Sequence, residues 1–414
     1  MKNVVVIGGG IIGLCSAYYL AKEGHKVTVV DQSAMRAGAS YVNAGYVSPS
    51  HIMPLAAPGV VKQGVKWMFD QSSPLYIKPK LQKEFLSWAW AFNKSCSKKN
   101  VVTSVSAIKD IALLSRELYS EIRASEGFQF QLENKGLLML CRSQQALEKE
   151  LEIAAIASAE GLEVSEVTPA ALQQMEPNVA VSVVGATHYM CDWHSTPNEF
   201  MEEMKAQLIK MGVSIISEEK VIDFKTSEAK IIAVITNTQE IVADEFVLAA
   251  GSWTAQLSKR FGIKIKLAAG KGYRINSSRD LGIQIPAILA ERKVAVTPMN
   301  GFTRFAGTME INGINHTINR RRVEAIANAV QSYYPSVNIM ETEKAGAACG
   351  LRPVSPDGRP YIGKSAKCKN LTIASGHAMM GWSMGPATGK LVSEIISEKK
   401  TTMDTTAFHV DRKF

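Results

Sequence analysis

Hydrophobic and polar residues alternate in short blocks at the start of the chain. A β-branched run at 4–7 is followed by a glycine-rich turn, an uncharged stretch at 14–21, and a second β-branched run at 27–30 that ends on Asp31. Short β-branched runs of this kind predict buried parallel strands. Parallel strands need a crossover connection, which is usually a helix. The opening residues therefore predict a strand, a helix and a second strand.

The glycines of the first turn indicate what this unit binds. Gly8, Gly10 and Gly13 form the pattern G-x-G-x-x-G, which suits a tight turn, close approach of a pyrophosphate, and close packing of the helix on the strand. The helix N-terminus presents free N–H groups to the phosphates. Asp31 lies 18 residues after Gly13, near the spacing of an acid that binds an adenosine ribose. A dinucleotide site is predicted, with NAD and FAD equally open at this point.

Residues 3–21 carry no charge, a property that a membrane span and a signal peptide share. A span needs about 20 mainly apolar residues in a helix. Four glycines within 8–13 suit a phosphate turn better than a helix. A signal peptide needs a cleavage region before the mature domain, whereas the second strand begins at once. Neither alternative fits the pattern.

The rest of the chain continues as alternating helical and strand-like segments. At roughly 100–200 residues per domain, 414 residues predict two or three domains. Prolines 49, 54 and 58 exclude a regular helix or central strand between them. Helices are predicted at 81–92, 101–124, 145–160, from about 168, and at 197–211, 319–333 and 385–397. Strands are predicted at 136–141, 213–224, 230–236, 240–248 and 371–376, and within 266–312.

Buried strands that end in glycine turns recur at 246–251 and 371–376. Nucleotide-binding elements therefore lie at both ends of the chain and near residue 250. This predicts an α/β fold (α+β overall), with a Rossmann-like cofactor domain and an inserted substrate domain built on a mostly antiparallel sheet. The expected boundaries are 1–60, 192–265 and 345–414 for the cofactor domain, and 61–191 and 266–344 for the substrate domain.

Charge and cysteine usage narrow the possible partners. The net charge of +9 is spread out rather than gathered in a basic patch with interleaved aromatics, so nucleic acid is not expected. The excess of positive charge suits binding of acidic small molecules or an anionic membrane surface. The six cysteines have no C-x-x-C spacing, and no paired histidines accompany them. No metal site and no disulfide framework are expected, which makes a reducing cytoplasm the default.

Motifs spread over nearly the whole chain resemble one enzyme family. They lie at 7–13, 40–49, 54–59, 192–197, 249–253, 271–273, 350–358 and 376–382. The chain resembles the FAD-dependent amino-acid oxidoreductases related to D-amino acid oxidase and glycine oxidase. It is most similar to the bacterial D-amino acid dehydrogenases of the small-subunit type. The Asn-Ala-Gly block at 43–45 and the block at 54–59 favour this dehydrogenase branch.

The resemblance implies FAD as the cofactor, with the substrate sheet lying over the flavin. Some sarcosine-oxidising relatives attach FAD to a cysteine near the motif at 350–358, but one position beyond Cys349, so non-covalent FAD is expected. The expected cofactor-binding residues are Gly8, Gly10, Ile11, Ile12, Gly13, Asp31, Gln32, Ser40, Asn43, Ala44, Gly45, Val221, Gly251, Gly376, His377, Gly381 and Trp382.

The resemblance also implies a substrate site. The arginine of the Gly-x-Arg-Pro motif, here Arg352, is expected to bind the substrate carboxylate through its planar fork and to orient Cα–H toward flavin N5. Tyr273 is expected to assist it as a second catalytic residue. Arg304 and His51 are further substrate-binding candidates. Met379 stands where glycine-oxidase relatives have an arginine, which predicts a more apolar pocket wall.

The predicted function is oxidation of a D-amino acid to a 2-oxo acid and ammonia, with electrons passed to a quinone or another acceptor. One alternative is oxidation of a secondary amine or imino acid such as D-hydroxyproline, proline, sarcosine or glycine. Another is an FAD-carrying electron-transfer subunit without amine turnover, which Arg352 argues against.

Aromatic residues at 67–69 and 85–92, with lysines nearby, predict either a membrane-interface patch or core packing of a helical arm. The expected location is the cytoplasm, with peripheral contact to the inner face of the cytoplasmic membrane.

Overall fold

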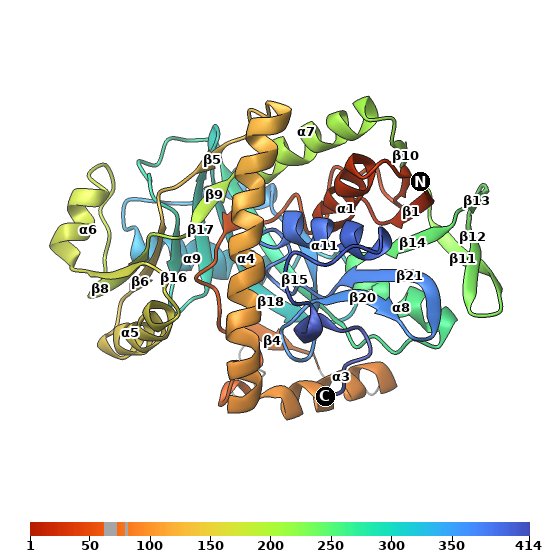
Figure 1. Ribbon diagram of the computed structural model, residues 1–414. Coiled ribbons are helices and arrows are strands. Elements are labelled where there is room, and N and C mark those ends of the chain that lie inside the picture. The colour runs from red at the N-terminus through yellow and green to blue at the C-terminus, as the bar shows by residue number, and fades with distance from the viewer. Residues whose placement is uncertain (62–72, 79–81) are drawn as a thin grey trace.

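A mostly parallel sheet forms one half of the molecule (Figure 1). The computed structural model describes residues 1–61, 73–78 and 82–414, and within them this sheet has the strand order β10-β2-β1-β14-β21-β20. All neighbours are parallel except β20, which pairs antiparallel with β21. The strands are β1 (Asn3–Ile7), β2 (Lys26–Val30), β10 (Ser214–Ile216), β14 (Glu245–Leu248), β20 (Tyr361–Ser365) and β21 (Cys368–Ser375).

Helices cover one face of this sheet and a small sheet covers the other. The helices are α1 (Ile11–Lys22), α4 (Lys98–Glu126), α7 (Pro197–Lys210) and α11 (Gly385–Ile396), whose apolar faces share one core with β1 and β2. The small antiparallel sheet is formed by β11 (Val221–Ser227), β12 (Lys230–Thr236) and β13 (Glu240–Val242), and the short helix α8 (Thr254–Ser258) packs beside it.

The predicted strand, helix and strand at the start of the chain are confirmed as β1, α1 and β2. Gly13 allows α1 to lie against β1, because a Cβ there would sit 1.8 Å from the Gly8 carbonyl oxygen. Gly389 has the same role between α1 and α11, where its Cβ would sit 2.4 Å from the carbonyl carbon of Cys15. These contacts leave the glycine turn at the carboxyl end of β1, where ligands of open α/β sheets bind.

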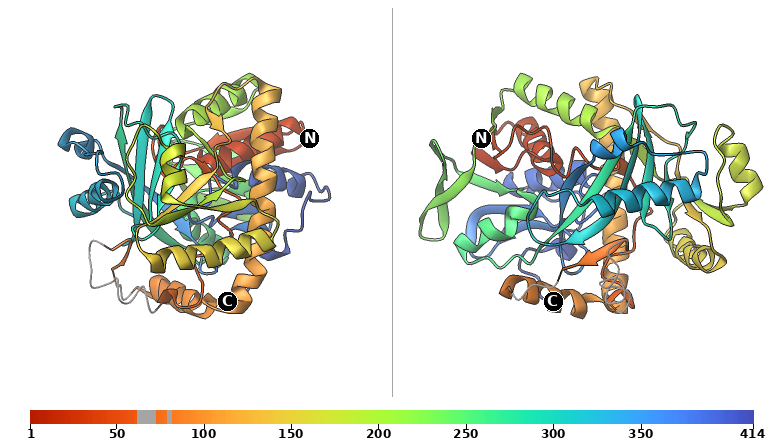
Figure 2. Two further views of the ribbon diagram at one scale, coloured as in Figure 1. Left: turned by 90° about the vertical axis from the view of Figure 1, so that its left-hand side faces the viewer. Right: turned by 180° about the vertical axis from the view of Figure 1, so that it is seen from behind.

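A larger sheet forms the other half, in the order β19-β15-β18-β17-β16-β6-β8-β7, with β4 beside β18. Its pairs are antiparallel except β6 with β16 and β4 with β18. The strands are β4 (Leu75–Ile77), β6 (Leu137–Cys141), β7 (Val164–Val167), β8 (Gly185–Tyr189), β15 (Ala268–Ser277), β16 (Ala287–Leu289), β17 (Val294–Met299), β18 (Phe302–Ile311) and β19 (Ala348–Val354). Helix α9 (Arg320–Tyr333) lies on its outer face, away from the parallel sheet (Figure 2).

The remaining elements sit around the two halves. A short sheet of β3 (Tyr46–Val47), β5 (Leu132–Glu133) and β9 (Trp193–Ser195) lies between them. Helix α3 (Lys83–Ser95) runs along the edge of the molecule near the C-terminus (Figure 1). The other helices are α5 (Gln144–Ala159), α6 (Pro169–Met175) and α10 (Glu341–Ala345), with short 3-10 turns at Gly251–Trp253, Lys259–Phe261 and Thr406–Phe408.

The fold class predicted from the sequence is confirmed, and several boundaries differ. The run at 213–224 divides into β10 and β11, and that at 240–248 into β13 and β14, because each piece pairs in a different sheet. Strand β19 lies beyond the expected boundary at 345 but belongs to the large sheet, paired with β15. Helix α4 was expected in the substrate domain but packs on α11. Within the ranges 1–61, 73–78 and 82–414, no helix combines the length and apolar character needed to cross a membrane.

Candidate functional site

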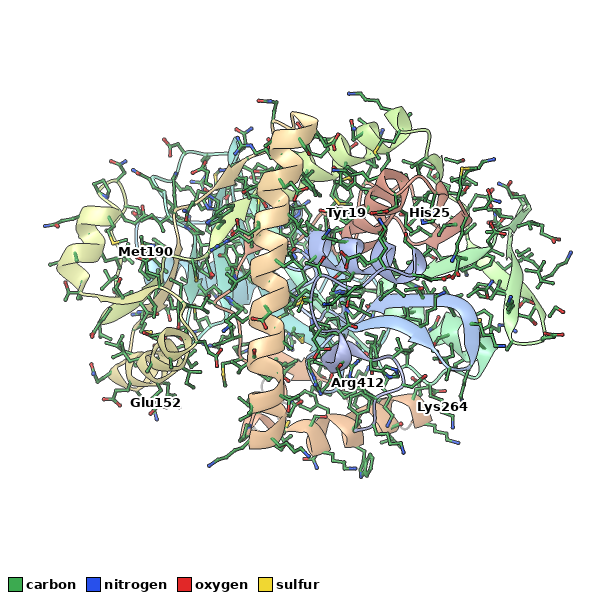
Figure 3. All side chains as sticks on the ribbon, viewed as in Figure 1. Tyr19, His25, Glu152, Met190, Lys264 and Arg412 are labelled. Carbon is green, nitrogen blue, oxygen red and sulfur yellow. The ribbon has the colours of Figure 1, made fainter. Side chains whose placement is uncertain are left out.

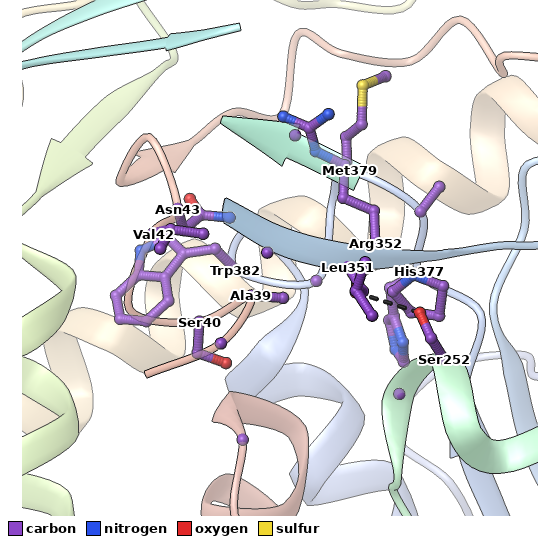
Figure 4. Close-up of a pocket in the computed structure, with 18 of the residues that line it drawn as sticks. Ala39, Ser40, Val42, Asn43, Ser252, Leu351, Arg352, His377, Met379 and Trp382 are labelled. Carbon is purple, nitrogen blue, oxygen red and sulfur yellow. Dashed lines mark hydrogen bonds between the residues drawn. The ribbon is translucent and has the colours of Figure 1, made fainter. Parts of the chain in front are cut away.

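A cavity of about 1420 Å³ lies between the two halves (Figure 4). Its walls come from the glycine turn, residues 37–44, residues 249–253, the facing parts of β15, β18 and β19, and residues 377–383. This volume exceeds the roughly 300–1,000 Å³ of a pocket for one small ligand. The cavity therefore has room for an extended cofactor together with a substrate.

The glycine turn presents bare backbone to this cavity. Gly8 has a left-handed φ of +111°, and a Cβ there would lie 2.5 Å from the Ala249 carbonyl oxygen. At Gly10 the one nearby atom is Ser40 Oγ, which accepts a hydrogen bond from the Ile11 N–H at 3.0 Å. The first turn of α1 is thus open to a ligand, as a diphosphate requires. The turn fits the phosphates of a dinucleotide.

Asp31 lies at the carboxyl end of β2, on the same wall. Its Oδ2 accepts a hydrogen bond from the Gly9 N–H at 2.7 Å, and its Oδ1 accepts from the Ser33 N–H and hydroxyl. The carboxylate is therefore held in place beside the glycine turn. Gln32 and Val221 line the cavity next to it. This end suits the ribose and adenine of a dinucleotide.

Residues 40–45 form the wall that faces the large sheet. The Asn43 side chain accepts a hydrogen bond from the Gly45 N–H at 2.8 Å, and Thr297 donates to the Ala44 carbonyl at 2.8 Å. Arg304 Nη1 donates to the carbonyls of Tyr41 and Asn43, at 3.0 and 2.6 Å. The loop is thus fastened to β17 and β18.

These bonds correct the expectation that Arg304 binds substrate. Its guanidinium is fully buried, lies outside the cavity lining, and is occupied by the loop carbonyls and by Asn276. Burial, followed by repulsion from Arg274, lowers the pKa of Arg304 to about 9. Arg304 therefore positions the loop rather than contacting a ligand.

The segment 377–383 closes the cavity on the other side. Ala378 donates to the Pro353 carbonyl at 2.9 Å, and His377 Nε2 lies 3.0 Å from the Thr388 hydroxyl. Burial lowers the pKa of His377 to about 3, so the ring is neutral. Trp382 donates from its indole N–H to Ser195 Oγ at 2.9 Å. Helix α11 begins directly after this segment, so its positive dipole end lies next to the cavity.

Arg352 extends from β19 into the cavity, in the same direction as Met379 in Figure 4. Its Nη1 donates to the Thr308 carbonyl at 2.8 Å. A Cβ on Gly272 would lie 2.4 Å from its guanidinium carbon, so the missing side chain at Gly272 creates the space for it. Burial lowers the pKa of Arg352 to about 10, which leaves it cationic at neutral pH.

No Asp or Glu carboxylate in the described ranges lies within 4.0 Å of the Arg352 guanidinium. Arg352 is half-buried, and a cation partly withdrawn from water without a counter-ion is unfavourable unless a ligand supplies one. The arrangement therefore provides a site for a small anion, and a planar guanidinium matches a carboxylate best.

Tyr273 does not take the predicted place beside Arg352. Successive strand residues point to opposite faces, and Gly272 faces the guanidinium, so the Tyr273 ring leaves the other face of β15. There its hydroxyl donates to Glu310 Oε2 at 2.9 Å, and the ring packs in the core under α9. Parts of Tyr273 line the cavity. Its hydroxyl is nevertheless committed to Glu310, which corrects the expectation that it binds substrate.

His51 lines the cavity on the side of the large sheet. Burial, followed by the charge of Lys293, lowers the pKa of His51 to about 4, so it is neutral. Its Nδ1 lies 4.0 Å from Oδ2 of Asp192, whose pKa burial raises to about 6. Glu150 of α5 and Tyr189 of β8, joined by a 2.7 Å hydrogen bond, share this wall. Nothing in the sequence pattern had marked these last two residues, since they read as ordinary helix and strand positions.

Most of the predicted site residues line this one cavity. They are Gly8, Gly10, Ile11, Ile12, Asp31, Gln32, Ser40, Asn43, Ala44, Val221, Gly251, His377, Gly381 and Trp382, together with His51, Arg352 and Met379. Gly13, Gly45 and Gly376 lie outside the lining. Gly13 packs α1 on β1, whereas Gly45 and Gly376 have left-handed φ angles and leave no room for a Cβ beside Ser195 and Tyr361. These three support the walls. In the described part of the chain, no cluster of three or more His, Cys, Asp or Glu side chains offers a metal site.

Comparisons with known proteins agree with this geometry. The D-amino acid dehydrogenase of Vibrio atlanticus is 31% identical over 402 residues, covering 95% of this chain and 96% of the relative. That of Rhizobium rhizogenes is 30% identical over 421 residues, covering 99% of each. The solved glycine oxidase from Geobacillus kaustophilus shares the fold with a TM-score of 0.79 at 21% identity, covering 100% of this chain and 99% of that one.

The L-proline dehydrogenase from P. horikoshii shares the fold with a TM-score of 0.76 at 19% identity, covering 99% of this chain and 96% of that one. The family model described as FAD dependent oxidoreductase (DAO) matches residues 3–395, nearly the whole of both halves. The cavity is lined both by the glycine turn and by Arg352, which has no carboxylate partner among the described residues, and the chain belongs to the DAO family of FAD-dependent oxidoreductases.

Proposed function

We propose that this protein oxidises D-amino acids to 2-oxo acids and ammonia, and passes the electrons to a quinone or another acceptor. The observation that carries the proposal is the Arg352 guanidinium, a cation in the cavity with no carboxylate partner among the described residues. The relatives named D-amino acid dehydrogenase support the choice of substrate, since they match over almost their full length. When bound, FAD supplies the hydride-accepting chemistry that amino-acid side chains lack.

The chain's own residues bind and orient the substrate. Arg352 has one Nη1 hydrogen bond to the Thr308 carbonyl, and its other N–H groups, which have no partner among the described residues, are left to bind the substrate carboxylate. Fixing the carboxylate limits the directions in which the Cα–H bond can point, and such positioning lowers the entropic part of the barrier. Met379 gives this wall an apolar side chain, which favours substrates with apolar side chains.

FAD is proposed to lie with its adenosine near Asp31, its diphosphate on the glycine turn, and its flavin between the walls at 40–44 and 377–383. We expect it to be held non-covalently. Cys349 lines the cavity, but burial raises the pKa of its thiol, and its Sγ lies 3.4 Å from the His316 carbonyl oxygen. Denaturation followed by ultrafiltration should leave the yellow colour in the filtrate. Colour retained on the chain would contradict non-covalent binding.

The test of the reaction is a substrate screen on purified holoenzyme. D-alanine, D-proline, D-hydroxyproline, glycine and sarcosine are each offered with an artificial dye and with oxygen. Dye-coupled turnover of the primary D-amino acids is expected. Faster turnover of sarcosine or the imino acids would replace the proposal with secondary-amine oxidation, and no flavin bleaching with any amine would favour a passive electron-transfer subunit.

The Arg352→Ala variant tests the carboxylate clamp. Its KM for the preferred amino acid should rise steeply, with kcat/KM down by about thirty- to four-thousandfold, because truncating one partner of a buried charge pair costs about 2–5 kcal/mol. Arg352→Lys keeps the charge but loses the planar fork, so its activity should lie between that of the wild type and that of Arg352→Ala. A kcat/KM near the wild-type value in Arg352→Ala would remove this residue from the site.

We also propose that the protein contacts an anionic membrane surface through α3. Trp88 and Phe92 on its inner face are packed in the core, whereas Leu86 and Trp90 are 51% and 60% exposed. The ammonium groups of Lys94 and Lys266 lie 5.1 and 5.7 Å from the centroid of the Trp90 ring. Lys264 lies at the same edge of the molecule (Figure 3). Exposed apolar side chains flanked by lysines suit a lipid interface.

Residues 85–92 of the predicted aromatic region therefore include both core and exposed side chains. Residues 67–69, the other part of that region, lie outside the described residues. Wild-type protein should sediment with vesicles of anionic phospholipid at low salt. The double variant Leu86→Ser, Trp90→Ser should stay in the supernatant with normal turnover of a soluble dye. Equal sedimentation of both proteins would refute the contact.

The six cysteines form no disulfide, which suits the proposed location at the cytoplasmic face of the membrane.

A further inference from the structure

A β-bulge interrupts the wall of the cavity beside Arg352. Strands β15 and β18 pair Lys271 with Glu310 and then Tyr273 with Gly307. One residue of β15, Gly272, therefore lies opposite two residues of β18, Thr308 and Met309. A bulge of this kind leaves one residue out of the ladder and turns its groups in a new direction, and such bulges are frequent beside active sites.

Thr308 adopts a strained backbone at this bulge. Its φ is +59°, in the left-handed region that a β-branched residue rarely occupies. The conformation lets the Thr308 carbonyl accept the 2.8 Å hydrogen bond from Arg352 Nη1. Opposite it, Gly272 leaves the space that the guanidinium fills. Strain that persists at a ligand site usually has a functional reason, and here one part of that reason is the placement of Arg352.

The Thr308 hydroxyl has a second use. The residue is 6% exposed and lines the cavity. Among the described residues its Oγ1 has no hydrogen-bond partner, although that atom is buried. Leaving a buried hydroxyl unpaired is unfavourable, and such groups are rare in folded proteins. A glycine at 308 would adopt the same φ without strain, so the arrangement of the backbone alone does not explain a threonine here.

We infer that Thr308 is a further substrate-binding residue, whose hydroxyl donates a hydrogen bond to the carboxylate that Arg352 holds. This inference rests on the proposed function. Thr308 and Arg352 both line this cavity, and the hydroxyl belongs to the residue whose carbonyl already accepts a hydrogen bond from the guanidinium. A carboxylate has lone pairs for both donors, since it accepts about four hydrogen bonds. The strained residue then orients the arginine through its carbonyl and the substrate through its hydroxyl.

Ligand binding tests this inference without turnover. Holoenzyme is titrated with benzoate and with its neutral counterpart benzamide, and the dissociation constants are measured by calorimetry. Thr308→Val keeps the shape and loses the donor. Its Kd for benzoate should rise about ten- to hundredfold, the usual effect of losing a hydrogen bond to a charged group. Its Kd for benzamide should change less than about threefold. Thr308→Ser retains the hydroxyl and should bind benzoate nearly as tightly as wild type.

Two further variants keep the test decisive. Thr308→Gly relieves the backbone strain and also lacks the hydroxyl, so it should lose the same affinity even if the valine variant folds poorly. Thr303→Val changes a buried threonine on the same strand outside the cavity lining, and its benzoate affinity should be unchanged.

The outcomes separate the inference from the proposed function. If Thr308→Val and Thr308→Gly both bind benzoate as tightly as wild type while Arg352→Ala loses this affinity, only the role of Thr308 is overturned. The carboxylate clamp at Arg352 then still stands. Retained preference for benzoate over benzamide in Arg352→Ala overturns the carboxylate clamp, and the role of Thr308 with it.

Discussion

Replacing Gly272 with alanine adds only a methyl group, yet it should displace the Arg352 guanidinium and so impair substrate binding. A Cβ at this position would lie 2.4 Å from the guanidinium carbon and Nη2 of Arg352, and 2.5 Å from Nη1. Ordinary van der Waals contact begins at 3.4 Å. Gly272 has no left-handed φ, so alanine is tolerated by the backbone. The guanidinium must therefore move by about 1 Å, which breaks its 2.8 Å hydrogen bond to the Thr308 carbonyl.

The size of the effect follows from this displacement. A misplacement of about 1 Å in a group that orients the substrate costs about a hundredfold in rate. A hundredfold loss corresponds to about 2.7 kcal/mol of transition-state stabilisation. We expect kcat/KM for the preferred amino acid to fall by this factor in Gly272→Ala, with the larger share in KM because the carboxylate contact is lost from the ground state as well.

The assay is steady-state reduction of an artificial dye by purified holoenzyme. Gly270→Ala is the matched control, because it lies on the same strand and its Cβ would meet side-chain atoms of Val354 and Met309 at 2.9–3.3 Å instead of the guanidinium. Both variants should retain FAD and have similar melting temperatures. A kcat/KM for Gly272→Ala within threefold of wild type would refute the reasoning, since it would show that Arg352 acts from another position or not at all.

Two other predictions concern Arg304, which holds a wall of the cavity, and His377, which lines it. Arg304→Met should lose FAD during gel filtration and unfold more easily, because the carbonyls of Tyr41 and Asn43 each lose a buried donor at a cost of about 1–3 kcal/mol; full FAD content with an unchanged melting temperature would contradict this role. The pKa of His377 is about 3 in the folded protein, below its unfolded value near 6.5, so between these values the unfolded chain binds the extra proton and stability falls as pH falls. The wild type should therefore lose about 1.2 kcal/mol relative to His377→Gln between pH 6 and 5, measured by urea unfolding; a constant difference would show that the histidine is not held neutral.

Local patterns in the sequence were sufficient to predict the first elements of the parallel sheet and the turn between them. Strand β1, the glycine turn, α1, β2 and Asp31 follow one another within a single stretch of chain. Each depends on periodicity and on contacts with near neighbours in sequence, which a pattern reports directly. The loops at 40–45 and 376–381 and the arginine of β19 were found through short motifs, and all of these residues line the cavity except Gly45 and Gly376.

The errors came from strands of the large sheet. Tyr273 and Arg304 were expected at the substrate, but one points to the opposite face of β15 and the other binds the cofactor-facing loop. Gly272 lay within a recognised motif, although nothing in the sequence showed that it faces Arg352. Thr308 carried no signal at all, because the bulge that turns it exists only where β15 and β18 pair.

The sequence by itself determined the glycine turn with its flanking strands and helix, the family, and Arg352 as the candidate for binding an anion. The tertiary structure alone decided which groups surround that arginine. The physical reason is register: in a strand, a shift of one residue moves every side chain to the other face, and the partner that sets the shift lies far away in the chain. Gly272, Thr308 and Arg352 come from three strands separated by dozens of residues, and they meet only because those strands pair as they do.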